Sequence, residues 1–124
     1  MANVVIGDYG LIGGGAAGIE LDRSDVALGT PPNPLILARS EDHTNSYLPT
    51  LEVLLINYPG QGAAESDLVR AEMMFFETPQ GGAVFSTGSI AWAGSLSHNN
   101  YSNDVSRITA NVVRRFIEPE PFIL

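Results

Sequence analysis

Two carboxylates beside a glycine-rich segment are the residues whose types and spacing best suit chemistry. Glu20 and Asp22 come directly after residues 12–18, which read IGGGAAG. In an extended backbone, side chains two positions apart lie on the same side, so Ile19 and Leu21 would face the opposite side, toward a core. Glycine lets a ligand approach the backbone closely, next to such a carboxylate. The pattern alone favours a simpler alternative, a half-buried strand with a solvated acidic side.

The glycine-rich segment formally fits the dinucleotide-binding pattern G-x-G-x-x-G through Gly13, Gly15 and Gly18. That fingerprint requires a strand before it and a helix after it, within a unit of about 30 residues. Pro31 and Pro32 leave little room for a helix and a return strand. No Lys-Ser or Lys-Thr pair ends the run, so a P-loop is excluded as well. We therefore interpret the segment as a flexible or closely packed loop and assign no cofactor-binding residue.

Two polar segments hold the other candidates for ligand contact. Glu41, Asp42 and His43 could be imagined as metal ligands, but adjacent loop side chains rarely converge on one ion. A solvated loop over residues 40–46 is the better interpretation. Residues 97–104 are rich in side-chain amides, which can bind a ligand but ordinarily cap turns.

The sequence contains no complete catalytic or metal-binding motif. It has no H-E-x-x-H, no EF-hand pattern and no Ser-His-Asp spacing, and its two histidines stand 55 positions apart. It has no cysteine, which excludes disulfides and thiolate metal sites.

Composition excludes several classes of partner. The 124 residues carry 14 acids against six arginines and no lysine, so the net charge is −8. This balance argues against binding nucleic acid or anionic lipid, both of which need clustered positive charge. No signal peptide opens the chain, and no apolar run approaches the ~20 residues of a membrane span. We expect a cytoplasmic protein.

Short strands are predicted to position these residues. A Thr-Pro-Gln-Gly turn at residues 78–81 joins an apolar run, predicted to be a central strand, to a return strand. The short apolar run at residues 35–38 predicts a buried strand. Trp92 stands among small residues and is expected in the core, with a pocket wall as the alternative. The predicted strands are residues 3–6, 18–23, 35–38, 51–58, 73–76 and 83–85. Residues 51–58 also fit a short helix, and we favour the strand.

Residues 103–117 predict the one clear helix. Val105, Ile108, Val112 and Phe116 form an apolar stripe at helical spacing. Ser102 or Asn103 supplies an N-cap, and two arginines near the end complement the helix dipole. One such helix covers only part of one face of a sheet that is apolar on both. We therefore expect further material to pack here, from an upstream segment, another subunit or both, in an oligomer.

Three stretches of the sequence resemble the large (beta) subunit of N,N-dimethylformamidase. The most specific likeness lies in residues 81–92, GGAVFSTGSIAW, and residues 103–112, NDVSRITANV. The block GGGAAGIELDR, followed by LGTPPNP, resembles the preceding part of the same family. The likeness covers nearly the whole chain and corresponds to the C-terminal part of that subunit.

The resemblance implies an amide hydrolase that cleaves dimethylformamide to dimethylamine and formate. It implies an α/β, glutamine-amidotransferase-like (Rossmann-like) fold, of which this chain is a partial domain of short strands with one C-terminal amphipathic helix. It also implies a mononuclear iron held by two tyrosines and a glutamate upstream of the matched region. We therefore expect residues 1–124 to be a single domain, the C-terminal segment of a larger amidohydrolase subunit. We assign it no metal ligand and expect it to be inactive alone.

The resemblance implies a catalytic role for Glu20. A family glutamate near the iron matches this position, where a carboxylate could orient a metal-bound water or accept its proton. Asp22 is the weaker candidate, with a structural role. The implied partners are the upstream part of the large subunit, a small subunit and a small amide substrate. Two alternatives remain open: a non-catalytic assembly module of the same fold, and a glutamine-amidotransferase-like domain acting on a sugar or another amide.

Overall fold

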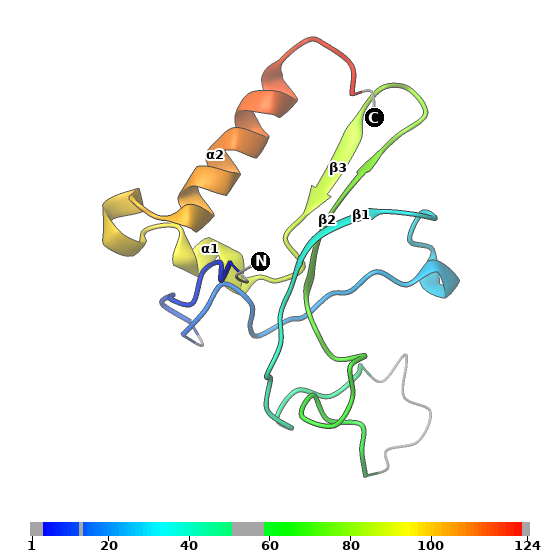
Figure 1. Ribbon diagram of the computed structural model, residues 1–124, viewed down its shortest axis with the longest axis vertical. Helices are drawn as coiled ribbons and strands as arrows, with labels where there is room; N and C mark the ends of the chain where they lie inside the picture. Colours follow the sequence, from blue (N-terminus) through cyan, green and yellow to red (C-terminus); the bar gives the residue numbers. More distant parts are fainter. Residues whose placement is uncertain (1–3, 13, 51–58, 123–124) are drawn as a thin grey trace.

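The computed structural model describes residues 4–12, 14–50 and 59–122. This part of the chain is a small α/β domain, a three-stranded antiparallel sheet with a C-terminal helix beside it (Figure 1). Its elements are η1 (Val26–Leu28), β1 (Leu35–Arg39), β2 (Glu72–Glu77), β3 (Ala83–Ser86), α1 (Ala91–Ser95), η2 (His98–Tyr101) and α2 (Asp104–Ile117).

The sheet has the order β1-β2-β3, and both neighbouring pairs are antiparallel. β2 lies in the centre and its first three residues are buried, which confirms the predicted central strand. The turn into β3 is also confirmed. Gly81 has a φ of +79°, and its N–H donates a hydrogen bond to the Thr78 carbonyl at 3.0 Å. A glycine takes this left-handed backbone without steric cost, so the local sequence fixes the hairpin.

β1 occupies the predicted position, but its predicted burial is wrong. Leu35 and Leu37 are 50% and 49% exposed. β1 is an edge strand, and its pairing with β2 shifts register between Ile36 and Ala38. A short apolar run indicates a strand but does not show what covers each of its faces.

The N-terminal part of the chain forms fewer strands than expected. The prediction for residues 18–23 is wrong, because Ile19 has a φ of +65° that interrupts the extended backbone. Its side chain is exposed and does not face the core. Residues 4–6 are not in a strand either, while residue 3 and the predicted strand at residues 51–58 lie outside the described residues.

Helix α2 confirms the predicted helix and its cap. The Asn103 side-chain oxygen accepts a hydrogen bond from the Ser106 N–H at 2.8 Å. The predicted apolar stripe is buried only at its N-terminal end, since Val105 is inaccessible and Phe116 is 41% exposed. Neither α2 nor any other described helix is long and apolar enough to cross a membrane.

The core is small and forms where the N-terminal segment, β2, α1 and α2 meet. Its buried members are Ala16, Met73, Trp92 and Val105. The Trp92 indole N–H donates to the Thr109 hydroxyl at 3.0 Å, so the expected core position of Trp92 is confirmed.

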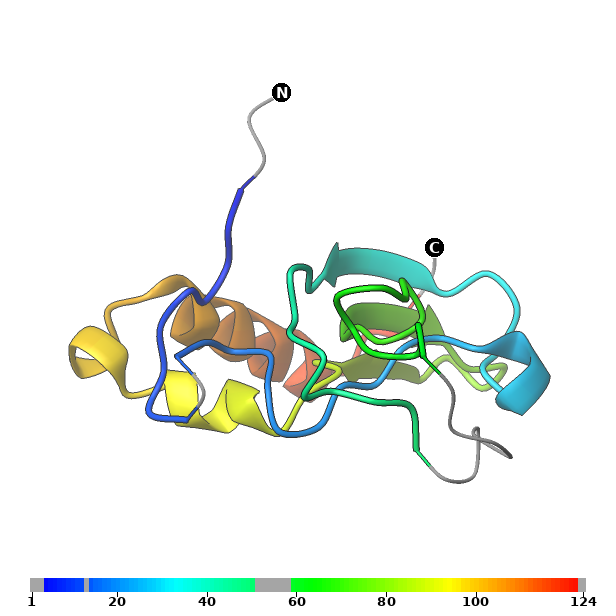
Figure 2. The same cartoon turned by 90° about the horizontal axis from the view of Figure 1, so that it is seen from below.

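The N-terminal segment runs beside α1, as Figure 2 shows in blue and yellow. The Leu11 N–H donates to the Gly94 carbonyl at 3.1 Å, and the Ser95 hydroxyl donates to the Tyr9 carbonyl at 2.7 Å. These contacts hold the glycine-rich loop against α1. Glu20 and Asp22 follow this loop in the chain, so the same contacts help to determine where they lie.

Candidate functional site

Glu20 lies in a tight turn with its side chain exposed to solvent. Its N–H donates to the Gly18 carbonyl at 2.8 Å, which closes a three-residue turn around Ile19. A turn of this kind with positive φ at its centre is rare and strained. Among the described residues, none forms a hydrogen bond or an ion pair with the Glu20 carboxylate, so it is available to a ligand.

The strain falls on a residue that is poorly suited to carry it. Ile19 is β-branched, and a left-handed conformation costs an ordinary L-residue roughly 1–2 kcal/mol. Such conformations persist only where the surrounding structure over-determines them, and they gather at functional sites. Contacts from other parts of the domain must therefore hold Ile19 in this conformation.

Two side chains hold the turn. The Ser89 hydroxyl accepts a hydrogen bond from the Gly18 N–H and donates one to the Gly18 carbonyl, both at 2.8 Å. The Tyr47 hydroxyl accepts the Ile19 N–H at 3.1 Å. A Cβ at Gly18 would lie only 3.3 Å from the Tyr47 hydroxyl oxygen. The backbone before Glu20 is thus fixed by residues distant in sequence.

Asp22 has a structural position. Its N–H donates to the Gly88 carbonyl at 2.8 Å, and its carbonyl accepts the Glu72 N–H at 2.8 Å. These bonds attach the segment to the start of β2. Glu20 and Asp22 are both exposed, whereas Leu21 between them is half-buried, although residues 18–23 do not form a strand.

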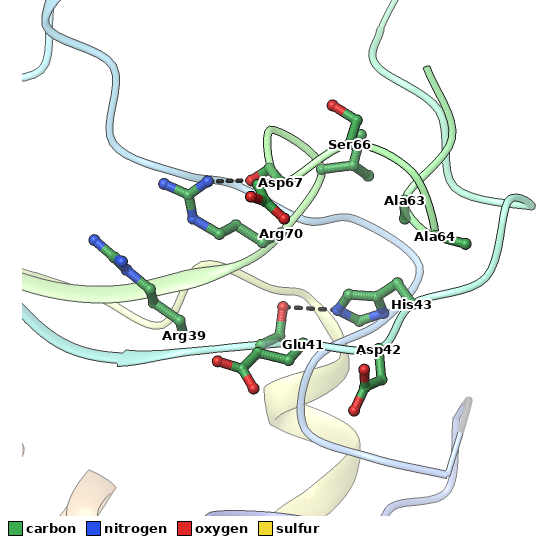
Figure 3. Close-up of a pocket in the computed structure, with 11 residues that line it drawn as sticks. Arg39, Glu41, Asp42, His43, Ala63, Ala64, Ser66, Asp67 and Arg70 are labelled. Carbon is green, nitrogen blue, oxygen red and sulfur yellow. Dashed lines mark hydrogen bonds between the residues drawn. The ribbon is translucent and has the colours of Figure 1, made fainter. Parts of the chain in front are cut away.

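A second candidate site is a cavity of about 560 Å³ between residues 39–43 and residues 63–70 (Figure 3). Arg39 and Arg70 lie together at one end and His43 lies at the other. The His43 Nε2 atom is 2.7 Å from the Ser40 hydroxyl oxygen, which also accepts the Ala71 N–H at 2.7 Å. Burial lowers the pKa of His43, against the opposing charge of Asp42, so a neutral ring can accept the Ser40 proton.

This serine–histidine pair lacks the rest of a hydrolytic site. An activated serine needs free donors for the developing oxyanion. The N–H groups of Ala63, Ala64 and Ser66 on the facing wall already donate within the protein. The His43 ring packs against the Tyr47 ring at 5.1 Å between centroids. We therefore assign Ser40 and His43 a structural role. They support Tyr47, whose hydroxyl binds the Ile19 N–H.

The two arginines at the other end of the cavity neutralise a buried carboxylate. Glu72 is fully buried, with an oxygen 2.8 Å from Arg70 and 3.1 Å from Arg39. The Ser24 N–H and hydroxyl donate to its other oxygen at 2.9 and 2.5 Å. Burial opposes ionisation, but the bonds from Ser24 and Arg70 outweigh it and lower the pKa of Glu72 to about 2. This network is structural.

The polar segment before α2 caps turns, as expected. The Asn103 amide donates to the carbonyls of Leu96 and His98 at 3.0 and 2.6 Å. The His98 ring stacks on Tyr9 with 4.0 Å between centroids, and the Tyr9 hydroxyl donates to the Asp104 carboxylate. The side chains of His98, Asn103 and Asp104 are therefore engaged in contacts within the domain.

The described residues do not fit a metal centre. They contain no group of three or more histidine, cysteine or acidic side chains that could hold an ion. Glu41 and Asp42 are exposed, and the Nε2 atom of His43 is bonded to Ser40. The hydroxyls of Tyr9 and Tyr47 are engaged with Asp104 and Ile19.

Sequence reasoning missed the residues that hold Glu20. Ser89 binds a backbone 71 positions away, and Tyr47 lies in a loop with no distinguishing pattern. Nothing in the residue types signals these contacts. The S-x-x-H spacing of Ser40 and His43 was visible in the sequence, but it carries no specific meaning without the fold.

The chain matches known proteins over almost all of its length. The family described as N,N-dimethylformamidase beta subunit-like, C-terminal, matches residues 2–103. The N,N-dimethylformamidase beta subunit of Paracoccus aminophilus is 52% identical over 116 residues, 94% of this chain. The beta subunit of the same name from an Alcaligenes species is 51% identical over an equal length. The matched region is only 15% of each of these relatives.

Proposed function

This chain belongs to the N,N-dimethylformamidase beta subunit family, and from that premise we propose that it is the C-terminal segment of an amide hydrolase subunit, to which it contributes Glu20 as a catalytic base. The proposed substrate is a small amide such as dimethylformamide, cleaved to dimethylamine and formate. The proposed partners are the upstream part of the same subunit and a small subunit, in a cytoplasmic oligomer.

One observation carries the assignment of Glu20. It is the exposed carboxylate that follows a strained and clamped turn, with Ile19 in the left-handed region and three backbone groups bonded to Ser89 and Tyr47. A general base must be held at a fixed place while its carboxylate stays accessible to a water molecule. Glu20 meets both conditions.

The chemistry that Glu20 would supply is a proton transfer. Its carboxylate accepts a proton from a water molecule as the water oxygen attacks the amide carbonyl carbon. The same proton then passes to the amine nitrogen as the C–N bond breaks, so formic acid and the free amine leave and the Glu20 carboxylate is restored. The formic acid then loses the second proton of the water to solvent and becomes formate. Each turnover consumes one water and one amide.

The iron that the family resemblance implies would be held by residues upstream of the matched region, as that resemblance has it, and the described residues do not fit a metal centre. We therefore derive no step through it. We also propose that residues 1–124 complete a larger glutamine-amidotransferase-like, Rossmann-like domain, in which the antiparallel sheet described here is one part.

The test is Glu20→Gln in a complete beta subunit that carries this segment. Removing the base should lower kcat by about a hundredfold or more, the usual contribution of general base catalysis, while the protein stays folded. Asp22→Asn is the matched control, because Asp22 serves through its backbone, and it should retain most of its turnover. Unchanged kcat in Glu20→Gln would remove the assignment.

A second candidate function is a non-catalytic assembly module. It is favoured by the apolar side chains that remain exposed on the sheet and on α2. That function predicts that Glu20→Gln leaves turnover intact while substitutions on the apolar face disrupt assembly.

A further inference from the structure

An apolar groove of about 330 Å³ separates the sheet from helix α2. Its sheet side is formed by Leu35 and Leu37 of β1, Phe75 of β2 and Phe85 of β3. Leu35 and Leu37 are half exposed. A contiguous patch of exposed apolar side chains ordinarily marks a surface that another segment or molecule covers. The groove exists because α2 is held to the domain mainly by its N-terminal half.

The C-terminal tail closes one end of this groove. Phe122 packs against Phe75 and Phe116, with ring centroids 5.5 and 5.0 Å apart, and the Arg115 guanidinium lies 4.0 Å from its centroid. The Phe122 N–H also donates to the Gly81 carbonyl at 3.0 Å, which ties the tail to the β2–β3 turn. The groove is thus an apolar surface bounded by the sheet, by α2 and by Phe122. Figure 1 shows α2 running beside β3.

We infer that this groove receives an apolar segment from the upstream part of the beta subunit. The inference rests on the proposed function. The relatives carry the matched region as 15% of their length, so most of their polypeptide is available to cover it. Attachment in the same chain gives such a segment a high effective concentration at the groove. A second copy is the poorer occupant, because each copy carries a net charge of −8 and the two would repel.

Photo-crosslinking in a complete beta subunit that carries this segment tests the inference. Benzoylphenylalanine in place of Leu37 should crosslink to an apolar run upstream, identified by mass spectrometry. The same group in place of Leu28, a leucine 72% exposed on η1 and away from the groove, is the control and should give at least about tenfold less of that product. A crosslink to another copy, or a yield at Leu37 no higher than at Leu28, would overturn the inference.

A charge substitution gives a second measurement. Leu37→Glu should lower the thermal midpoint of the complete subunit by several degrees, because the carboxylate must stay solvated and would keep the segment out. Leu28→Glu should leave it nearly unchanged, and equal midpoints would count against the groove. Glu20→Gln should keep the Leu37 crosslink, so loss of the catalytic assignment and loss of the docking site can be told apart.

Discussion

At the scale of single residues, two glutamates lie in opposite environments. Glu72 is buried and bonded to two arginines and a serine, so its charge is neutralised inside the protein. Glu20 has an exposed carboxylate and follows Ile19, whose left-handed backbone is bonded to Tyr47. A residue held in place with an unused functional group is available for chemistry, whereas one that is fully bonded stabilises the fold.

Glu72→Gln should destabilise the chain by about 3 kcal/mol. The substitution leaves Arg39 and Arg70 without their buried counter-charge, and breaking one partner of a buried ion pair costs ~3–5 kcal/mol. We choose the lower end because Arg39 is largely exposed. Urea unfolding measures the change. Glu77→Gln, at the other end of β2, is the control and should stay within about 0.5 kcal/mol of the wild type.

The lowered pKa of Glu72 predicts how the unfolding free energy depends on pH. The pKa of Glu72 is about 2 in the folded protein and 4.5 ordinarily, so its contribution is complete above pH 4.5 and is lost as the pH falls toward 2. At 1.36 kcal/mol per pH unit, the loss is ~3 kcal/mol. Between pH 4.5 and pH 2, the unfolding free energy of Glu72→Gln should fall less steeply with decreasing pH than that of the wild type. A fall as steep as that of the wild type would contradict this account.

At the scale of elements, helix α2 depends on its first turn. Asn103 caps the helix through its side-chain oxygen and also ties its amide to the carbonyls of Leu96 and His98. The far end of the helix lacks comparable burial, since Phe116 is 41% exposed. The helix is therefore positioned from its N-terminus, which is why a groove opens toward its other end.

Asn103→Ala should cost about 2 kcal/mol of unfolding free energy. Loss of an N-cap costs ~1 kcal/mol, and the lost amide bonds add a similar amount. Asn111→Ala, on the exposed middle of the same helix, should cost less than about 0.5 kcal/mol. Equal effects of the two substitutions in thermal unfolding would show that the cap does not fix the helix.

At the scale of the whole molecule, the described residues bury little and expose much apolar surface. Seven hydrophobic residues of the described chain are buried, four of which form the core cluster, while Leu35, Leu37 and Phe116 remain exposed around the groove. The expectation from sequence that one helix cannot cover the sheet agrees with this surface.

The isolated chain should therefore bind a hydrophobic dye such as anilinonaphthalene sulfonate. A complete beta subunit that carries this segment should bind markedly less dye per molecule of segment, because the groove is then covered. Fluorescence titration measures both. Absence of dye binding by the isolated chain would contradict the view that the chain lacks part of its cover.

The sequence alone determined the elements whose causes are local. The Thr-Pro-Gln-Gly turn, the helix with its Asn103 cap and the core position of Trp92 all follow from residues close together in the chain. Turn chemistry, capping and helical periodicity act over a few residues, so a pattern can predict them. The family resemblance was visible for the same reason, because it lies in continuous stretches.

Only the tertiary structure decided the left-handed turn at Ile19, the edge position of β1 and the open groove. Alternation predicted an extended strand through Glu20, yet Ser89 and Tyr47 bind its backbone from far along the chain and impose a turn. Likewise, an apolar strand has the same sequence pattern whether one of its faces is covered or exposed to solvent. Each of these features depends on which distant residues meet, and residue order within a short window does not encode that.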